Sequence, residues 1–214
     1  MSGRFDALFV DFGGVLTSNV FDAFGDYCES AGLARDAFAS LLRSDPAAAR
    51  LLRDVETGNL SEAEFELRFA PMLGAGTGIS IEPEGLIARL TTTLRADEPM
   101  LEMLGHVHEA GPKTAIVSNS FGYGAYDGYD LARLVDHVVL SGDVGVRKPS
   151  RRIYSMAAEI AGVDPARCVF VDDLPQNITG AERVGMTGIH HTHAAITIPR
   201  LEELFELDLT DSPV

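Results

Sequence analysis

Charged and polar residues stand directly after short apolar runs, or in the loop that follows one, at several places in this sequence. These residues are Asp11, Ser118, Asn119, Lys148, Asp172 and Asp173. Together they supply three carboxylates, one hydroxyl, one amide and one ammonium. The set holds no Cys–His pair and no serine beside a base, so it does not indicate a thiol or serine nucleophile. Its chemistry is that of carboxylate oxygens and one positive charge.

The apolar runs predict the strands that would position these residues. The clearest are 7–10, 114–117 and 168–171, and weaker ones cover 137–140 and 187–190. They lack period-2 alternation, which is typical of parallel strands buried on both faces. Helical spacing of apolar residues fills the intervals from about residue 97 onward. We therefore expect a three-layer, doubly wound α/β sandwich, whose ligands bind beyond the carboxyl ends of the strands.

Residues 17–96 interrupt this alternation, because no further strand-like run appears there. Apolar residues recur at helical spacing instead, Ser61 and Glu64 form a capping-box pattern, and another helix is predicted over 83–94. We predict an α/β core from residues 1–16 and 97–214, with a helical cap inserted over 17–96.

Four motifs in this order resemble those of the haloacid dehalogenase superfamily. They are Phe9-Val10-Asp11-Phe12-Gly13-Gly14-Val15-Leu16, Ile116-Val117-Ser118-Asn119, Lys148-Pro149 and Phe170-Val171-Asp172-Asp173. Each motif alone is weak, but their order and the inserted cap match over essentially the whole chain. Within the superfamily, the chain most resembles the branch that contains the N-terminal phosphatase domain of soluble epoxide hydrolases and bacterial glucose-1-phosphate phosphatases. This resemblance depends on Asp-x-Gly-(Gly/Asn)-Val, Gly-Val-Arg-Lys-Pro and Val-Asp-Asp-x-x-x-Asn.

This resemblance implies Mg²⁺-dependent hydrolysis of a small phosphomonoester, with sugar phosphates among the candidates. Asp11 would attack phosphorus and form an aspartyl-phosphate that water hydrolyses. Lys148 would neutralise charge, and Ser118 with nearby backbone N–H groups, including that of Asn119, would bind the phosphate oxygens.

The resemblance also implies the metal ligands. Asp11, the backbone carbonyl of Gly13 and Asp173 would bind Mg²⁺, which prefers oxygen ligands. Asp172 is assigned to the same metal site, where it would hold a metal-bound water or Lys148.

Gly13 departs from the pattern of most phosphatases in the superfamily. They carry a second Asp at this position, which protonates the leaving alcohol and activates water. General acid–base catalysis is typically worth about 10²–10⁴-fold, so its loss predicts slow turnover or a preference for good leaving groups. Three interpretations follow: a phosphatase that uses water or another group, a different chemistry, or a silent binding protein.

Dehalogenation is the main alternative chemistry, since dehalogenases of this superfamily also lack that Asp. They resemble one another in carrying Ser-Ser-Asn where this chain has Asp172-Asp173-Leu174, and they need no metal. Two adjacent carboxylates near a nucleophilic one make little electrostatic sense without a cation. Phosphonate cleavage would need a cap lysine, and residues 17–96 contain none.

Composition limits the partners. The chain has 214 residues with 17 Lys+Arg and 32 Asp+Glu, a formal charge of −15. Such an acidic protein repels duplex nucleic acid and anionic membranes, whereas a small phosphorylated metabolite is compatible with it. Neither a signal peptide nor a transmembrane run is apparent, and two cysteines suggest no disulfide scaffold, so we expect a cytoplasmic protein. The sequence leaves its oligomeric state open.

Several further residues have less specific patterns. Arg147 is interpreted as a solvated surface residue. His190, His191 and His193 are interpreted as a strand-end loop, with a metal site as the alternative. Tyr123, Tyr126 and Tyr129 are expected in an irregular loop, with substrate contact as the alternative. Thr17, Ser18 and Asn19 are candidate substrate contacts from the cap, chosen from their sequence position alone.

Overall fold

The computed structural model describes residues 4–209, so the outermost ends of the predicted core, 1–3 and 210–214, lie outside the described residues. Five parallel strands form one sheet in the order β3-β2-β1-β4-β5. They are β1 (Ala7–Val10), β2 (Lys113–Ser118), β3 (His137–Leu140), β4 (Cys168–Asp172) and β5 (Thr187–His190). Each strand coincides with a predicted apolar run to within one residue at either end.

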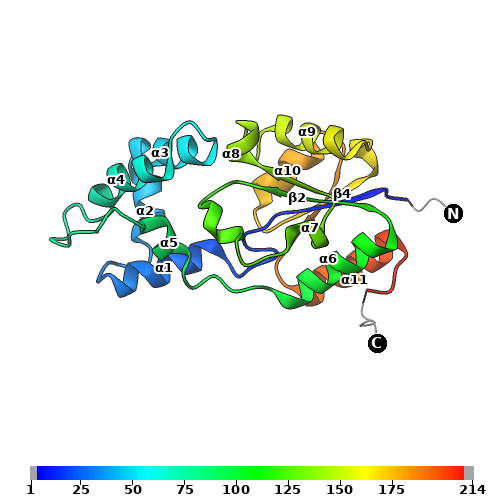
Figure 1. Cartoon of the computed structure of the whole chain (residues 1–214), viewed down its shortest axis with the longest axis horizontal. Coiled ribbons are helices and arrows are strands. Elements are labelled where there is room, and N and C mark those ends of the chain that lie inside the picture. The colour runs from blue at the N-terminus through cyan, green and yellow to red at the C-terminus, as the bar shows by residue number, and fades with distance from the viewer. Residues whose placement is uncertain (1–3, 210–214) are drawn as a thin grey trace.

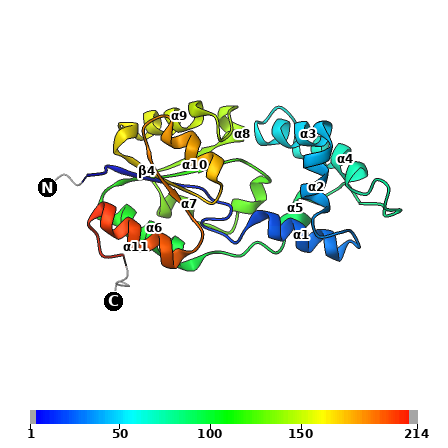
Figure 2. The same ribbon diagram turned by 180° about the vertical axis from the view of Figure 1, so that it is seen from behind.

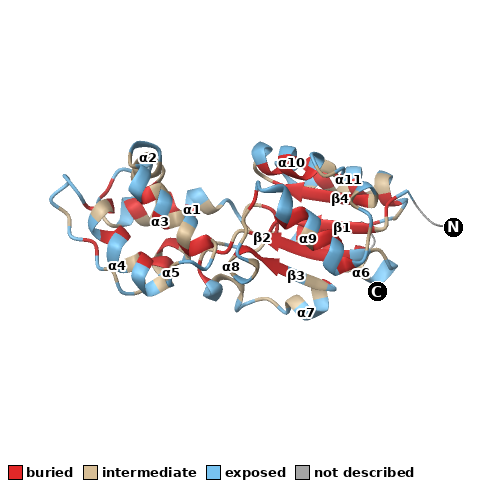
Figure 3. Cartoon of the chain, turned by 90° about the horizontal axis from the view of Figure 1, so that it is seen from above, coloured by how far each residue is buried: buried red, intermediate tan, exposed pale blue. Residues whose placement is uncertain are grey.

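Helices cover both faces of this sheet (Figures 1 and 2). The long ones are α6 (Glu98–Ala110), α9 (Arg151–Ala161), α10 (Pro175–Glu182) and α11 (Ala194–Phe205). Leu8 and Val10 pack with α6 and α11 on one face, whereas Ala7 and Phe9 pack with α9 and α10 on the other. Figure 3 shows the strands buried between these layers. The predicted three-layer α/β fold is confirmed.

Local signals in the sequence set the ends of several helices. The Ser150 hydroxyl accepts the Arg152 N–H at the start of α9, and Gly162 ends that helix with a left-handed φ of 69°. Shorter helical segments lie in the connections between strands and helices. They are η1 (Tyr123–Tyr126), α7 (Leu131–Leu134), α8 (Ser141–Val144) and η2 (Pro165–Arg167).

A separate group of helices lies between β1 and α6 in the sequence and extends from one end of the sheet (Figure 1). We call it the helical insertion; it comprises α1 (Val20–Ser30), α2 (Ala37–Ser44), α3 (Pro46–Glu56), α4 (Glu62–Leu73) and α5 (Leu86–Thr91). It has its own apolar core, in which Phe24, Phe38, Phe65 and Phe69 are buried. The predicted capping box of Ser61 and Glu64 is present at the start of α4.

One helix of the insertion is shorter than predicted. The spacing predicted a helix over 83–94, but α5 begins at Leu86. Gly85 precedes it with a left-handed φ of 72°, and its N–H donates to the Glu66 carboxylate on α4 at 3.0 Å. This tertiary contact keeps the residues before Leu86 out of the helix.

The two chain segments that enter and leave the insertion run side by side. Thr17 and Ala96 form an antiparallel bridge. The Ser18 N–H donates to the Arg95 carbonyl at 2.8 Å, and the Asp97 N–H donates to the Leu16 carbonyl at 2.9 Å. The insertion is therefore attached to the sheet through one paired two-strand connection.

Two further sequence expectations concern membrane-spanning segments and the cysteines. Across residues 4–209 we find no helix with the length and apolarity needed to cross a membrane. The two cysteines, Cys28 and Cys168, are buried free thiols.

Candidate active site

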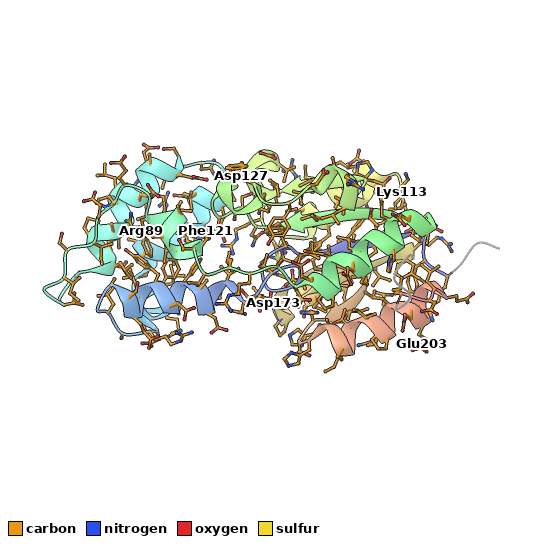
Figure 4. The ribbon with its side chains drawn as sticks, turned by 60° about the horizontal axis from the view of Figure 1, so that its bottom comes forward. Arg89, Lys113, Phe121, Asp127, Asp173 and Glu203 are labelled. Carbon is orange, nitrogen blue, oxygen red and sulfur yellow. The ribbon has the colours of Figure 1, made fainter. Side chains whose placement is uncertain are left out.

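The residues predicted to carry chemistry meet at the carboxyl ends of three neighbouring strands. Ser118 ends β2, Asp11 directly follows β1, and Asp172 ends β4. Asp173 follows Asp172, and Lys148 enters from the loop between α8 and α9. Residues from four distant parts of the chain are thus brought together by the strand order β2-β1-β4. Figure 4 labels Asp173 at the junction between α1 and the sheet.

Lys148 is the fully buried cation at the centre of this group. Its Nζ lies 2.7 Å from Asp11 Oδ1 and 2.7 Å from Asp172 Oδ2. Burial alone would favour the neutral amine, but the two carboxylates outweigh it and raise the pKa of Lys148 above its ordinary value. The ammonium therefore stays charged and links the two acids.

Two asparagines hold this charged group in place. The Asn119 side chain forms hydrogen bonds with both backbone polar groups of Lys148. Its Nδ2 donates to the Lys148 carbonyl at 3.2 Å, and its Oδ1 accepts from the Lys148 N–H at 2.8 Å. Asn177 donates to both oxygens of Asp172, at 2.9 and 3.1 Å. The Asn119 side chain is thus committed to positioning Lys148, and only its backbone remains for a ligand. Asn177 belongs to the motif that the sequence displayed, although no role was assigned to it there.

The acids of the site carry more negative charge than Lys148 balances. Asp11, Asp172 and Asp173 with Lys148 have a formal charge of −2 when all four are ionised. Burial raises the pKa of Asp11 to about 8 against the lowering effect of Lys148, and burial together with Asp172 raises the pKa of Asp173 to about 6. The site thus favours the uptake of positive charge, either as protons or as a cation.

The donor set fits a small divalent cation. Asp11, Asp172 and Asp173 each offer a carboxylate oxygen, and these atoms lie within 4.8 Å of one another. Asp172 already accepts from Lys148, Asn177 and the Leu174 N–H, so Asp11 and Asp173 are the better placed ligands. An all-oxygen set with carboxylates is the kind that Mg²⁺ prefers.

Gly14 is required by the close approach of the Asp173 carboxylate. Its φ is 80°, and a Cβ there would lie 2.4 Å from Asp173 Oδ2. On its other side, Asp173 Oδ2 accepts a hydrogen bond from Asn19 Nδ2 at 3.2 Å. Any side chain at residue 14 would displace Asp173 from the other acids.

Ser118 lies on the other side of Asp11. It is buried, and its Oγ accepts a hydrogen bond from the Tyr126 hydroxyl at 3.0 Å. The Ser118 proton is thereby free to be donated to an anionic ligand. Tyr126 thus belongs to the site, whereas Tyr123 bonds to Asp143 and Tyr129 packs on Phe12. Of these three tyrosines, Tyr126 is the one that contacts the cluster, through its hydrogen bond to Ser118.

A cavity of about 340 Å³ opens onto this cluster between the sheet and the helical insertion. Asp11, Gly13, Ser118, Asn119 and Asp173 line one end of it. These five predicted residues therefore lie at the floor of a pocket whose walls come in large part from the insertion, whereas Lys148 and Asp172 are buried and do not line it.

Sequence reasoning missed one ion pair in the wall of this cavity. Arg147, interpreted above as solvated, is half-buried, and its Nη1 lies 2.9 Å from Oε2 of the buried Glu56 on α3. Burial raises the pKa of Glu56 to about 7, although Arg147 counteracts this. The only signal in the sequence was an acid next to the apolar positions of α3, which is too weak to identify a partner 91 residues away.

The candidate cap contacts near residue 17 do not line the cavity. Thr17 and Ser18 bond within the paired connection to the insertion, and Asn19 caps α1 and bonds Asp173. These short polar side chains satisfy backbone groups at the connection instead.

The histidines form no metal site with one another. His191 is buried against Thr197 Oγ1 at 2.8 Å, and His190 Nε2 lies 2.9 Å from the Asp173 carbonyl. Within residues 4–209, the one cluster suited to a metal is that of Asp11, Asp172 and Asp173.

Comparison with known proteins is consistent with this geometry. The protein-family model of haloacid dehalogenase-like hydrolases matches residues 5–185 of this chain. A sesquiterpene phosphatase of Aspergillus oryzae is 29% identical over 139 residues, covering 62% of this chain and 69% of its own. A glyceraldehyde 3-phosphate phosphatase of Methanopyrus kandleri is 33% identical over 96 residues, covering 42% of this chain and 40% of its own.

A solved structure shares the fold. It is a haloacid dehalogenase family enzyme of Bacteroides thetaiotaomicron in a magnesium complex, with a TM-score of 0.70 at 19% identity. The superposition covers 88% of this chain and 94% of that one.

The Glu56 carboxyl predicts a pH-dependent difference in stability. Its folded pKa of about 7 exceeds its ordinary value of 4.5, so the folded state loses stability as pH rises between these values. Glu56→Gln removes this loss. The free energy of unfolding of the variant relative to the parent, measured with urea, should therefore rise from pH 5 to pH 8 by up to about 3 kcal/mol.

Exposed Glu82→Gln is the matched control and should show no such trend. An equal effect of Glu56→Gln at both pH values would show that Glu56 is ionised throughout.

Proposed function

Because the chain belongs to the haloacid dehalogenase-like hydrolases, we propose that it is a magnesium-dependent phosphatase that hydrolyses a small phosphomonoester through an aspartyl-phosphate on Asp11. The observation that carries the proposal is the buried Lys148 ammonium, which binds Asp11 at the floor of a cavity beside a second, uncompensated carboxylate, Asp173. The phosphatase names of two relatives support the same reaction class.

Asp11 is the proposed nucleophile. Its Oδ1 accepts from Lys148 Nζ and from the Phe12 N–H, both at 2.7 Å. These contacts fix the carboxylate and leave Oδ2 as the oxygen that we assign to attack on phosphorus. The bond from Oδ2 to phosphorus forms as the bond to the leaving oxygen breaks, and water later cleaves the resulting acyl phosphate.

Lys148 and Ser118 are proposed to bind the transferring phosphoryl group. Lys148 supplies a charge that is already desolvated and held between two acids, so little reorganisation is needed when the phosphate enters. Ser118 donates its hydroxyl proton to a phosphate oxygen, while its Oγ accepts a hydrogen bond from the Tyr126 hydroxyl. The backbone N–H of Asn119 is proposed as a second donor.

Asp11, Asp173 and the carbonyl of Gly13 are proposed to hold Mg²⁺, with Asp172 oriented toward Lys148. When bound, the cation would offset the repulsion between the phosphate dianion and the carboxylates and polarise the phosphoryl oxygens. The excess negative charge among these residues is the reason that a cation suits them.

At residue 13, where most phosphatases of the superfamily carry the general acid, Val20 occupies the space that a side chain would need. A Cβ on Gly13 would lie 2.5 Å from Val20 Cγ2 of α1. An aspartate therefore does not fit at residue 13 unless Val20 moves. We expect turnover to depend strongly on the leaving group, because no side chain at this position can protonate the departing alcohol.

Dehalogenation is disfavoured by the same charges. Asp172 and Asp173 add two carboxylates beside the nucleophile, and Lys148 balances only part of that charge. We further propose that residues 17–96 act as the cap, since the helices of this range form the wall opposite Asp11.

The first test is release of para-nitrophenol from para-nitrophenyl phosphate, with Mg²⁺ and then with EDTA. We expect metal-dependent release that falls by about 10³-fold or more in Asp11→Asn, because the nucleophile is lost. The exposed Asp127→Asn is the matched control and should keep full activity. Undiminished release by Asp11→Asn, or release that EDTA does not affect, would overturn the proposal.

A second test restores the missing acid. Gly13→Asp combined with Val20→Ala makes room for the carboxyl group. We expect kcat to rise by about 10²-fold or more for alkyl phosphates, whose alcohols leave poorly, and to change little for para-nitrophenyl phosphate.

Val20→Ala alone serves as the control for this test. Equal changes for both kinds of substrate would mean that another group already protonates the leaving alcohol.

A further inference from the structure

We propose that the alcohol part of the substrate is an apolar hydrocarbon, such as an aryl or isoprenoid group, and not a sugar. This inference rests on the proposed phosphatase function, because the phosphate must lie against Asp11 and Lys148 for the rest of the molecule to enter the cavity.

The wall of the cavity away from the acids is built from apolar side chains. They come from three helices of the insertion and from the segments after α5 and β2. The apolar lining residues of this wall are Val20, Phe21, Phe24, Leu42, Leu52, Leu94, Phe121 and Ala125. Figure 4 labels Phe121 among the helices of the insertion, although it follows β2 in the sequence. Both parts of the chain thus present apolar groups to the same space.

One of these residues leaves a large apolar surface in water. Phe21 is 46% exposed, whereas Phe24, one helical turn away, is 4% exposed and packs among other rings in tilted geometry. The Phe21 ring stands edge to face on Phe24 with centroids 5.8 Å apart. Such an exposed aromatic ring beside a cavity is stabilised when an apolar ligand covers it.

Polar groups that a sugar would need are scarce in this wall. Among the described residues lining the cavity, Arg147 is the single cation, and its Nη1 is paired with the Glu56 carboxyl group at 2.9 Å. Thr91 and Gln176 are the neutral hydrogen-bonding side chains outside the phosphate end. Burying several sugar hydroxyls without partners costs about 1–3 kcal/mol for each, so a polyhydroxylated substrate is poorly matched.

Two arginines of the insertion are paired with acids outside the cavity. Arg35 pairs with Asp26 at 2.6 Å and with Glu29 at 2.8 Å, and Arg50 lies 3.6 Å from Asp54. No arginine of the insertion lines the cavity as far as residues 4–209 are described. A second phosphate or a carboxylate on the substrate would therefore meet no cation from the insertion, and Arg147 in the wall is already paired with Glu56.

The size of the cavity favours a compact hydrocarbon. Its volume of about 340 Å³ lies near the lower end of the range for small-ligand pockets, about 300–1,000 Å³, and the phosphate occupies part of it. The substrate is accordingly a small or medium-sized ester and not a two-chain lipid.

The test uses phenyl phosphates with para substituents that alter polarity but hardly alter the acidity of the phenol. The pair 4-propylphenyl phosphate and 4-(2-hydroxyethyl)phenyl phosphate has the same number of heavy atoms, so leaving-group quality and size are matched. We expect kcat/KM to be about tenfold or more higher for the propyl compound. From methyl to propyl it should rise about fourfold per methylene, the value for full burial. Glucose 6-phosphate should be a much poorer substrate.

Substitutions in the cavity wall test whether its apolar side chains cause the preference for the propyl compound. Leu42→Gln and Leu52→Gln place an amide in the cavity and should reduce the propyl-to-hydroxyethyl ratio several-fold. Leu67→Gln is the matched control: Leu67 is a 64% exposed leucine on α4 that does not line the cavity, and its replacement should leave the ratio unchanged. Because the ratio is measured within one protein, partial loss of folded enzyme does not alter it.

The two hypotheses fail in different ways. Turnover of phenyl phosphate with equal or higher kcat/KM for the hydroxyethyl compound or glucose 6-phosphate would overturn the apolar assignment and leave the phosphatase intact. A ratio that Leu42→Gln and Leu52→Gln leave unchanged would also overturn it. No phosphate release from any of these esters in the presence of Mg²⁺ would overturn the proposed function, and this inference with it.

Discussion

The site depends on one buried ammonium shared by two carboxylates. Lys148 has no contact with water, and it keeps its charge because Asp11 and Asp172 lie 2.7 Å away on either side. A buried charge of this kind is tolerated only with such partners. Its three members come from different parts of the chain, so the group exists only when the sheet is assembled. Asn119 and Asn177 then fix the lysine backbone and the second acid. The fold and the chemistry are linked at this point.

Much of this arrangement could be predicted from the sequence, because the relevant signals are local. The apolar runs located the five strands, and the parallel topology implied that residues after β1, β2 and β4 would meet. Motif order then selected Asp11, Ser118, Lys148 and the two adjacent acids Asp172 and Asp173 at the end of β4. Helix ends were less predictable where a tertiary contact decided them, as at Gly85, whose N–H is taken by Glu66 of another helix.

The walls of the cavity could not be predicted, because they depend on how the insertion packs against the sheet. An amphipathic helix exposes its second apolar edge to solvent, to a neighbour or to a cavity, and periodicity does not distinguish these cases. Leu52 and Phe121 are far apart in the sequence and yet line one space. The pairing of Glu56 with Arg147 is likewise a contact across the two parts of the molecule. Long-range complementarity of this kind leaves no periodic trace.

The paired connection at Thr17 and Ala96 joins the insertion, which supplies cavity walls, to the sheet, which holds the charged group. Since entry and exit lie side by side, the insertion is topologically a long loop between β1 and α6, and its length and contents can change without altering the register of any strand. Mutation and recombination can therefore explore new cavity walls while the reactive group stays fixed on the sheet. In this architecture, the residues of the cavity wall can therefore diverge much faster than the charged residues held on the sheet.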